Sequence, residues 1–422
     1  MDNIARLVKL LAREVLDSRG NPTLEVEAFS AKYRASAIVP SGTSTGKYEA
    51  IELRDGKKRY FGKGVQCAVE NVALISRRLK GMQIDQERID HALLSLDGTE
   101  NKSRLGANAI LGVSMAVARL CALENHIPLY EYISKISNSK PLMPLPFANV
   151  INGGKHAGTR LKMQEFIICP IGAKRFSHAA EMVSETYHLL KEVIKKRYGV
   201  QYTNVGDEGG FVIPVEKAEE ALFVLEASIE QAGYKKEIRI ALDAAASEFY
   251  NQNGLYLLHR QFTSEQLIEY YLDLVKSYKI ISFEDPFDQD DFTSYNAFTK
   301  KSKIQVVGDD LLVTNPSRIS IAVQKRLCNA LLLKVNQIGT LTEAVKAAGI
   351  AKKAGWKVMV SHRSGETEDA FISDLAVGLG CGQIKLGAPC RGERTAKYNQ
   401  LLRIEEFSNA RLIGLQRVLQ KP

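Results

Sequence analysis

The sequence predicts an α/β protein in which a small N-terminal α+β domain precedes a β/α barrel. One observation behind this prediction is a series of short apolar runs in the second half of the chain, which recur at a nearly even step. The other is a different pattern before residue 135, where strand-like residues are followed by helical ones. A chain of 422 residues is long enough for two or three domains.

The N-terminal segment contains elements of both types. Residues 4–15 have apolar positions that suit a helix, but the same run suits a strand equally well. Residues 23–29 alternate apolar and acidic side chains, which is typical of a half-buried strand. Residues 62–81 and 104–124 have helical spacing, and the second is apolar nearly all round, which predicts a buried helix. Strands followed by helices indicate a small α+β domain.

A polar and then proline-rich stretch over residues 134–146 is the best domain boundary in the chain. It follows a helical pattern and precedes the evenly spaced runs. We therefore expect one domain over residues 1–135 and a second over residues 136–422.

Five apolar runs in the second half end on a charged residue, and a sixth, shorter run follows. From Glu284 onward their charged ends lie 25, 25, 28 and 23 residues apart, by subtraction of residue numbers. This step is the length of one strand plus one helix in a β/α barrel, where about 250 residues supply eight units. The runs cover residues 238–243, 280–284, 304–309, 330–334, 358–362 and 382–385.

Charged residues at the ends of such strands converge on one mouth of the barrel, where barrel enzymes place their chemistry. A single aspartate after a strand is as readily a turn former or a helix cap. Three carboxylates in register repel one another unless a cation holds them, and oxygen-only ligands favour magnesium. Several cations at the same mouth indicate an anionic substrate that carries phosphate or carboxylate. The acidic set is Asp243, Glu284 and Asp309, and the basic set is Lys334, His362, Arg363 and Lys385.

Other candidate residues lie at strand ends and in glycine-containing loops. His156 follows a Gly-Gly turn after the apolar run 147–151, and Gln164 and Glu165 lie in another strand-like run. A glutamate in such a run is costly to bury unless it is paired. Glycines flank Glu208 closely enough to let it approach a ligand. The residues alone leave the alternative open that His156 is structural and Glu208 is a solvated turn residue.

The loop over residues 40–48 has the glycines of a phosphate-binding loop but not its spacing. Three residues separate Gly42 from Gly46 where a P-loop has four, and Tyr48 stands where Ser or Thr would bind magnesium. This argues against an NTPase. The hydroxyl-rich segment suits either a lid over a ligand or a plain surface turn.

The composition is that of an ordinary globular protein, with 45% hydrophobic and 25% charged residues. No apolar run approaches the roughly 20 residues of a membrane span, and we expect neither membrane insertion nor a signal peptide. Six cysteines without a C-x-x-C pair predict reduced thiols in a cytoplasmic protein. The net charge of +9 permits nucleic-acid binding, but the basic clusters are short and lack interleaved aromatic residues, so no nucleic-acid partner is expected.

Long motifs give the chain a resemblance to enolases over essentially its full length. The two most specific are Leu331-Leu-Leu-Lys-Val-Asn-Gln-Ile-Gly-Thr and Ser361-His-Arg-Ser-Gly-Glu-Thr-Glu-Asp. Further matching motifs cover residues 17–23, 40–46, 97–102, 106–114, 206–211 and 284–291. The motif Arg391-Gly-Glu-Arg carries Gly392 where serine is frequent.

The resemblance implies an eight-stranded barrel that begins atypically, with two strands and then two helices. It also implies a hydro-lyase that reversibly dehydrates 2-phospho-D-glycerate to phosphoenolpyruvate. Two Mg²⁺ ions per site are implied, the second arriving with the substrate. A homodimer or a homo-octamer is expected, with the protein cytoplasmic apart from a minor surface fraction. Family members displayed on cell surfaces bind plasminogen through C-terminal lysines, and this chain offers Lys421.

The resemblance also assigns roles residue by residue. Lys334 resembles the base that takes the C2 proton, and Glu208 the acid that protonates the departing hydroxyl. We expect burial and Glu165 to raise the pKa of Glu208, and Lys385 and Mg²⁺ to lower that of Lys334. The expected metal ligands are Asp243, Glu284, Asp309 and Ser44, and the expected substrate contacts are His156, Gln164, Glu165, His362, Arg363, Ser364 and Lys385.

Two rival hypotheses come from other functional classes. One is a superfamily relative that abstracts a proton beside a carboxylate in a different substrate. The motif Ser361-His-Arg-Ser and the loop of Ser44, to which the resemblance gives phosphate and second-magnesium roles, argue against it. The other is a non-catalytic binding protein on the same scaffold, whose signature would be loss of Lys334, Glu208 or a metal ligand. All of these residues are present.

Overall fold

The computed structural model describes residues 5–43, 46–56, 58–408 and 410–412. The described chain opens with an antiparallel sheet of three strands in sequential order, β1 (Lys9–Leu16), β2 (Pro22–Phe29) and β3 (Arg34–Ile38). The segment that suited both helix and strand is therefore strand from Lys9 onward. In β2 the side chains of Leu24, Val26 and Ala28 are buried, which confirms the predicted alternation.

Four helices complete the N-terminal part: α1 (Gln66–Leu79), α2 (Gln86–Asp97), α3 (Ala107–Glu124) and α4 (Leu129–Ile136). The buried helix α3 packs on β2 and β3. By length and composition α3 could cross a membrane, which corrects the expectation that no apolar run comes near a span. Because 83% of its apolar window is buried inside the protein, α3 serves here as a core helix. The division of the chain after residue 135 remains a prediction.

Eight strands close into a barrel in the order β10-β11-β12-β13-β4-β5-β6-β9. All six predicted runs are barrel strands. Strand β5 runs antiparallel to both of its neighbours, and two long helices follow it before β6. The barrel therefore begins with two strands and two helices, as the resemblance implied. The strands are β4 (Leu145–Asn152), β5 (Glu165–Cys169), β6 (Arg239–Asp243), β9 (Ser282–Glu284), β10 (Gln305–Gly308), β11 (Ala330–Leu333), β12 (Lys357–Ser361) and β13 (Gly382–Lys385).

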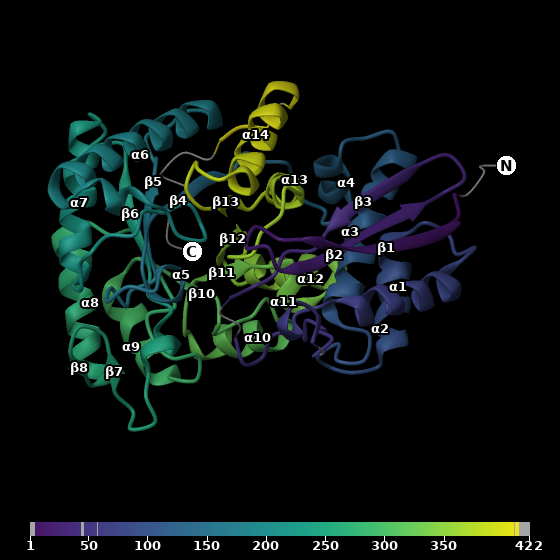
Figure 1. The fold of residues 1–422 in the computed structure, drawn as a ribbon, viewed down its shortest axis with the longest axis horizontal. Helices are drawn as coiled ribbons and strands as arrows, with labels where there is room; N and C mark the ends of the chain where they lie inside the picture. Colours follow the sequence, from purple (N-terminus) through teal and green to yellow (C-terminus); the bar gives the residue numbers. More distant parts are fainter. Residues whose placement is uncertain (1–4, 44–45, 57, 409, 413–422) are drawn as a thin grey trace.

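Helices surround the barrel, and the N-terminal domain lies to one side of it (Figure 1). The barrel interior is filled by apolar side chains that include Phe147, Val307 and Leu332. A small hairpin, β7 (Tyr256–Leu257) and β8 (Gln261–Phe262), lies outside the barrel sheet. The helices are α5 (Gly154–Ala157), α6 (Phe176–Tyr198), α7 (Ala218–Gln231), α8 (Ser264–Tyr278), α9 (Phe292–Ser302), α10 (Pro316–Lys325), α11 (Val335–Ile338), α12 (Leu341–Lys353), α13 (Phe371–Gly378) and α14 (Gly392–Phe407).

The N-terminal domain contacts the barrel at the mouth formed by the strand ends. Ser41 and Gly365 exchange two backbone hydrogen bonds of 2.7 and 2.8 Å, and the backbone N–H of Ser18 donates to the carbonyl of Glu366 at 2.7 Å. The two motifs that carry Ser18 and Ser41 are thus docked on the loop that follows β12. Residues from both domains can therefore contribute to one site.

Candidate active site

The charged residues predicted at the strand ends do meet at one mouth of the barrel. Asp243, Glu284 and Lys385 are the last residues of β6, β9 and β13, and Asp309, Lys334 and His362 directly follow β10, β11 and β12. Glu165 reaches the same mouth for a different reason. It is the first residue of the antiparallel strand β5 and lies opposite Asp243 in the sheet register.

A small polar cavity lies at this mouth. Its lining brings together the predicted base, the predicted acid and all of the predicted substrate contacts. The lining residues are His156, Gln164, Glu165, Glu208, Asp243, Lys334, Ser361, His362, Arg363, Ser364 and Lys385. Ser44, predicted as a metal ligand, lies outside the described residues.

Lys385 is a buried cation surrounded by carboxylates. Its Nζ lies 2.9 Å from Asp243 Oδ2, 2.8 Å from Glu284 Oε1 and 3.0 Å from Glu165 Oε2. Burial opposes the charge, but these three carboxylates raise the pKa of Lys385 well above its ordinary value. The ammonium therefore stays charged and compensates an acidic cluster that would otherwise be unstable in the interior.

The acidic residues at this mouth fit a divalent hard cation. Asp243 and Glu284 are opposite each other on adjacent strands, and β10, which leads to Asp309, is the next strand. Burial, and then repulsion from Asp243, raises the pKa of Glu284 well above its usual range, so this carboxylate favours a neighbouring cation. Oxygen donors without sulfur or imidazole suit Mg²⁺, which Asp243, Glu284 and Asp309 would hold.

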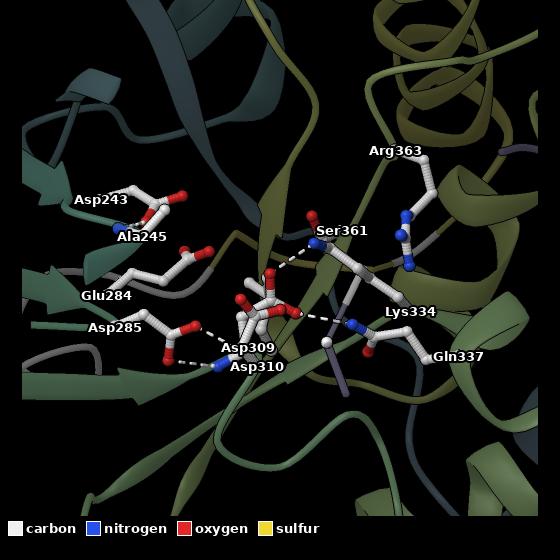
Figure 2. Close-up of polar contacts among 12 residues, drawn as sticks. Asp243, Ala245, Glu284, Asp285, Asp309, Asp310, Lys334, Gln337, Ser361 and Arg363 are labelled. Atoms are coloured by element: carbon white, nitrogen blue, oxygen red, sulfur yellow. Dashed lines mark hydrogen bonds and ion pairs between the residues drawn. The ribbon is translucent and has the colours of Figure 1, made fainter. Parts of the chain in front are cut away.

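Asp285 and Asp310 form a second acidic group together with Asp309. Neither of them was among the candidate residues predicted from the sequence. Carboxylate oxygens of Asp285, Asp309 and Asp310 lie within 4.8 Å of one another. Asp285 accepts hydrogen bonds from the backbone N–H groups of Asp309 (3.0 Å) and Asp310 (2.6 Å), as Figure 2 shows. The hydroxyl of Tyr295 also donates to Asp285 at 2.8 Å. Asp285 thus fixes the backbone that presents Asp309.

Lys334 forms an ion pair with Asp309. Its Nζ lies 2.5 Å from Asp309 Oδ2, while Gln337 donates to Asp309 Oδ1 at 2.8 Å (Figure 2). Burial, Arg363 and Lys385 all act to lower the pKa of Lys334, but Asp309 and Glu284 outweigh them and raise it above the ordinary value. Lys385 thus lowers the pKa of Lys334 as expected, but Asp309, which sequence spacing did not reveal, gives a net rise, and the effect of Mg²⁺ stays a prediction.

Glu208 accepts a hydrogen bond from Asn149 and has two histidine rings nearby. Asn149 donates to its Oε2 at 2.9 Å, His362 Nε2 lies 3.5 Å from the same oxygen, and His156 Nδ1 lies 3.4 Å from Oε1. Burial acts to raise the pKa of Glu208, but His156, His362 and Arg394 lower it well below the ordinary value. The expected raised pKa is thus wrong here. In Glu165, burial and then Glu208 raise the pKa well above its usual range, so Glu165 is the member of the pair that holds a proton more readily.

Glycine is required around Glu208 because the chain passes close to other backbone there. A Cβ at Gly206 would lie 2.8 Å from the carbonyl oxygen of His156, and one at Gly209 would lie 2.9 Å from that of Cys390. Gly209 also has φ of +82°, which disfavours other residues. Backbone packing thus accounts for these glycines, and the approach of Glu208 to a ligand stays a prediction.

The predicted phosphate contacts are joined to the N-terminal domain. Arg363 Nη1 lies 3.0 Å from Glu49 Oε2, and Ser364 Oγ both accepts from the backbone N–H of Thr43 and donates to its hydroxyl, each at 2.8 Å. Glu49 was missed by the sequence reasoning, although it stands next to the loop that was singled out. Thr43 within that loop and Glu49 directly after it are therefore in contact with the candidate anion site.

Comparisons with known proteins agree with this architecture. Two family models match the chain: "Enolase, N-terminal domain" over residues 7–133 and "Enolase, C-terminal TIM barrel domain" over residues 140–416. A curated enolase from Mastigamoeba balamuthi is 55% identical over 421 aligned residues, which cover 96% of each chain. The chain therefore belongs to the enolase family and is an enzyme of the hydro-lyase class.

Proposed function

We propose that this enolase catalyses the magnesium-dependent, reversible dehydration of 2-phospho-D-glycerate to phosphoenolpyruvate, as a step of glycolysis and gluconeogenesis. The observation that carries the proposal is a single polar cavity lined by Lys334, Glu208, Lys385 and Arg363. Such a cavity combines a potential base and acid with cations that suit a phosphorylated carboxylic acid.

The difficult step is removal of the C2 proton, because it leaves a second negative charge on a carboxylate. Lys385 is buried and charged, and its fixed ammonium can stabilise that charge as it develops. Bound magnesium would supply further positive charge to the same group. The proposed ligands are Asp243, Glu284 and Asp309, with Ser44 for a second ion that arrives with the substrate.

Lys334 is proposed as the base at C2. A lysine acts as a base only as the neutral amine, whereas Asp309 favours the ammonium form in the described structure. Arg363 and Lys385 oppose the charge on Lys334. Separation of Asp309 from Lys334 is therefore the condition for a neutral amine at working pH.

Glu208 is proposed as the acid that protonates the departing C3 hydroxyl. As an acid, Glu208 must carry a proton, whereas its surroundings lower its pKa and favour the carboxylate. His156 lies between two carboxylates, with Nδ1 3.4 Å from Glu208 Oε1 and 3.7 Å from Glu165 Oε1. We infer that Glu165 and Glu208 share protons, so that the proton held by Glu165 and the proton needed on Glu208 are not independent.

The remaining lining residues are proposed to orient the substrate. Arg363 and Ser364 would bind the phosphate, and Lys385 the carboxylate. His156, Gln164, Glu165 and His362 would contact the carbon chain and its hydroxyl groups. We further propose a cytoplasmic homodimer or homo-octamer. A minor surface fraction that binds plasminogen through Lys421 is a further proposal, tested by capture with and without that residue, which lies outside the described structure.

Ultraviolet absorbance of the enol product tests the main proposal. Purified protein is mixed with 2-phosphoglycerate and Mg²⁺, and excess EDTA is added during the reaction. A rise in absorbance that EDTA stops is expected. No rise from folded protein with fresh metal would favour a different acid substrate or a non-catalytic protein.

A further inference from the structure

Helix α14 (Gly392–Phe407) carries a buried arginine in its first turn, behind the cavity. Arg394 is fully buried, and it is not among the residues that line the cavity. An arginine that cannot be deprotonated is costly to bury unless acceptors surround its guanidinium. The hydrogen-bond acceptors around Arg394 therefore indicate the role of its buried guanidinium.

The guanidinium of Arg394 joins two loops that are far apart in the sequence. Nη2 donates to the carbonyl of Asp207 at 3.0 Å and to that of Ser364 at 2.7 Å. Nη1 donates to the carbonyl of Arg363 at 2.6 Å. One planar group thus sets the spacing between the loop of Glu208 and the loop that holds Arg363 and Ser364.

The same guanidinium also determines which nitrogen of His362 carries the proton. Arg394 Nη1 lies 2.6 Å from His362 Nδ1. Because a guanidinium donates and cannot accept, Nδ1 must present its lone pair. The proton of the neutral imidazole is then on Nε2, which lies 3.5 Å from Glu208 Oε2.

Close packing leaves little room for other arrangements of this pair. A Cβ at Gly387 would lie 3.0 Å from Arg394 Cδ and 3.1 Å from His362 Cε1. Gly387 has φ of +80°, so glycine suits this position on both counts. The side chains of Arg394 and His362 are therefore confined against the backbone of the chain.

We propose that Arg394 is a positioning residue, which fixes the Nε2-protonated tautomer of His362 toward Glu208 and holds the two active-site loops in register. This rests on the proposed role of Glu208 as the acid. Loss of Arg394 should therefore slow the departure of the C3 hydroxyl more than the removal of the C2 proton. The proposed base for that removal, Lys334, lies directly after β11.

Lys397, one turn further along α14, is the matched comparison. It is also fully buried, and its Nζ lies 2.8 Å from Glu366 Oε2 in the same loop. No bond from Lys397 to His362 or to residues 206–210 is found in the described part of the chain. A variant of Lys397 therefore tests loop support without the tautomer contact.

The first measurement uses the unmodified protein, so it does not depend on whether a variant folds. Nitrogen-15 NMR of the histidine-labelled enzyme reports the protonation of each ring nitrogen of His362, assigned with a His362→Gln variant. We expect a protonated Nε2 and an unprotonated Nδ1 at pH 7. A protonated Nδ1 would overturn the proposal.

The second measurement separates the two chemical steps in Arg394→Lys and Lys397→Met. Exchange of the C2 hydrogen of 2-phosphoglycerate with solvent deuterium follows the base step, and enol absorbance follows the whole reaction. In Arg394→Lys we expect overall turnover to fall about 100-fold, within the range of general acid catalysis, while C2 exchange falls less than tenfold. Lys397→Met should lower both rates by a similar factor.

Equal losses of exchange and turnover in Arg394→Lys would reduce Arg394 to a structural residue and overturn the proposal. Failure of the proposed function has a different signature, because the unmodified enzyme would then show neither exchange nor enol formation. The NMR result decides the tautomer in either case.

Discussion

The Nζ of Lys385 lies 2.9 Å from Oδ2 of Asp243, inside the barrel mouth. The two residues end strands β13 and β6, which are not neighbours in the sheet. Glu284 and Glu165 complete the surroundings of the ammonium. A proposed metal ligand is therefore already neutralised by a lysine in the described structure.

Replacing Lys385 with methionine should destabilise the metal-free protein, because it leaves three buried carboxylates without their cation. Breaking a buried pair in this way costs about 3–5 kcal/mol of unfolding free energy. Denaturant unfolding in EDTA measures the loss, and added Mg²⁺ should recover part of it. The control is Lys235→Met, since its pair with Glu230 is solvent-exposed and should contribute little to stability. Equal stability of Lys385→Met and the unmodified protein in EDTA would contradict this account.

Lys334→Ala and Glu208→Gln should each abolish turnover and leave the fold intact. General acid or base catalysis contributes about 10²- to 10⁴-fold in rate, so losses of at least that size are expected in each purified variant. Enol absorbance measures turnover, and circular dichroism checks the fold. The matched control is Lys325→Ala at the exposed end of α10. Near-normal rates in either active-site variant would remove that residue from its role.

Asp309→Asn should weaken the dependence on magnesium sharply, because an amide oxygen is a poorer ligand than a carboxylate for a hard cation. Initial rates over a magnesium titration give the concentration required for half-maximal activity, which should rise by an order of magnitude or more. Asp374→Asn is a control at a buried carboxylate in α13 that is not among the proposed metal ligands. An unchanged titration for Asp309→Asn would place Asp309 outside the metal site.

His362 should remain neutral across the physiological range, because burial lowers its pKa to about 4. The sign follows from proton binding: between pH 6.5 and pH 4 the unfolded chain binds more protons at this residue than the folded protein does. Its contribution to stability is therefore present above pH 6.5 and is lost as the pH falls toward 4. The expected difference is about 3 kcal/mol, or less after relaxation of the site.

Unfolding free energies measured from pH 7 to pH 4 test this titration, with His362→Gln as the comparison. The variant should lose less stability on acidification than the unmodified protein. Imidazole NMR signals of His362 that move with a midpoint near pH 6.5 would show that the residue is not held neutral.

Parallel barrel strands were predictable because they are buried on both faces and read as continuous apolar runs. The antiparallel direction of β5 was not predicted, because composition does not reveal strand direction, and the family resemblance implied only the order of two strands and then two helices. Residues 4–15 stayed open between helix and strand because β1 lies at a sheet edge, where Val8 before it and Leu11 within it are exposed and obscure the alternation.

Site residues at strand ends were predictable from position alone. Arg394, Asp285 and Glu49 were missed because each acts through a partner distant in sequence, which spacing cannot reveal. The expected pKa direction of Glu208 was wrong for the same reason, and the sequence did not reveal the carboxylate that raises the pKa of Lys334. The sequence identifies the residue types. It does not show that Asp309 lies beside Lys334 or which polar groups surround Glu208.

The pairing of β13 with β4 has a consequence for synthesis of the chain. Gln383 pairs with Leu145, so the sheet cannot close until the last barrel strand has left the ribosome. Released chains that end at residue 362 should be cleaved rapidly by protease, whereas the full-length chain should resist, and resistance of the shorter chain would contradict this order. Because β13 also delivers Lys385, the growing chain carries an open strand edge and an uncompensated acidic cluster together, and the same late strand removes both hazards.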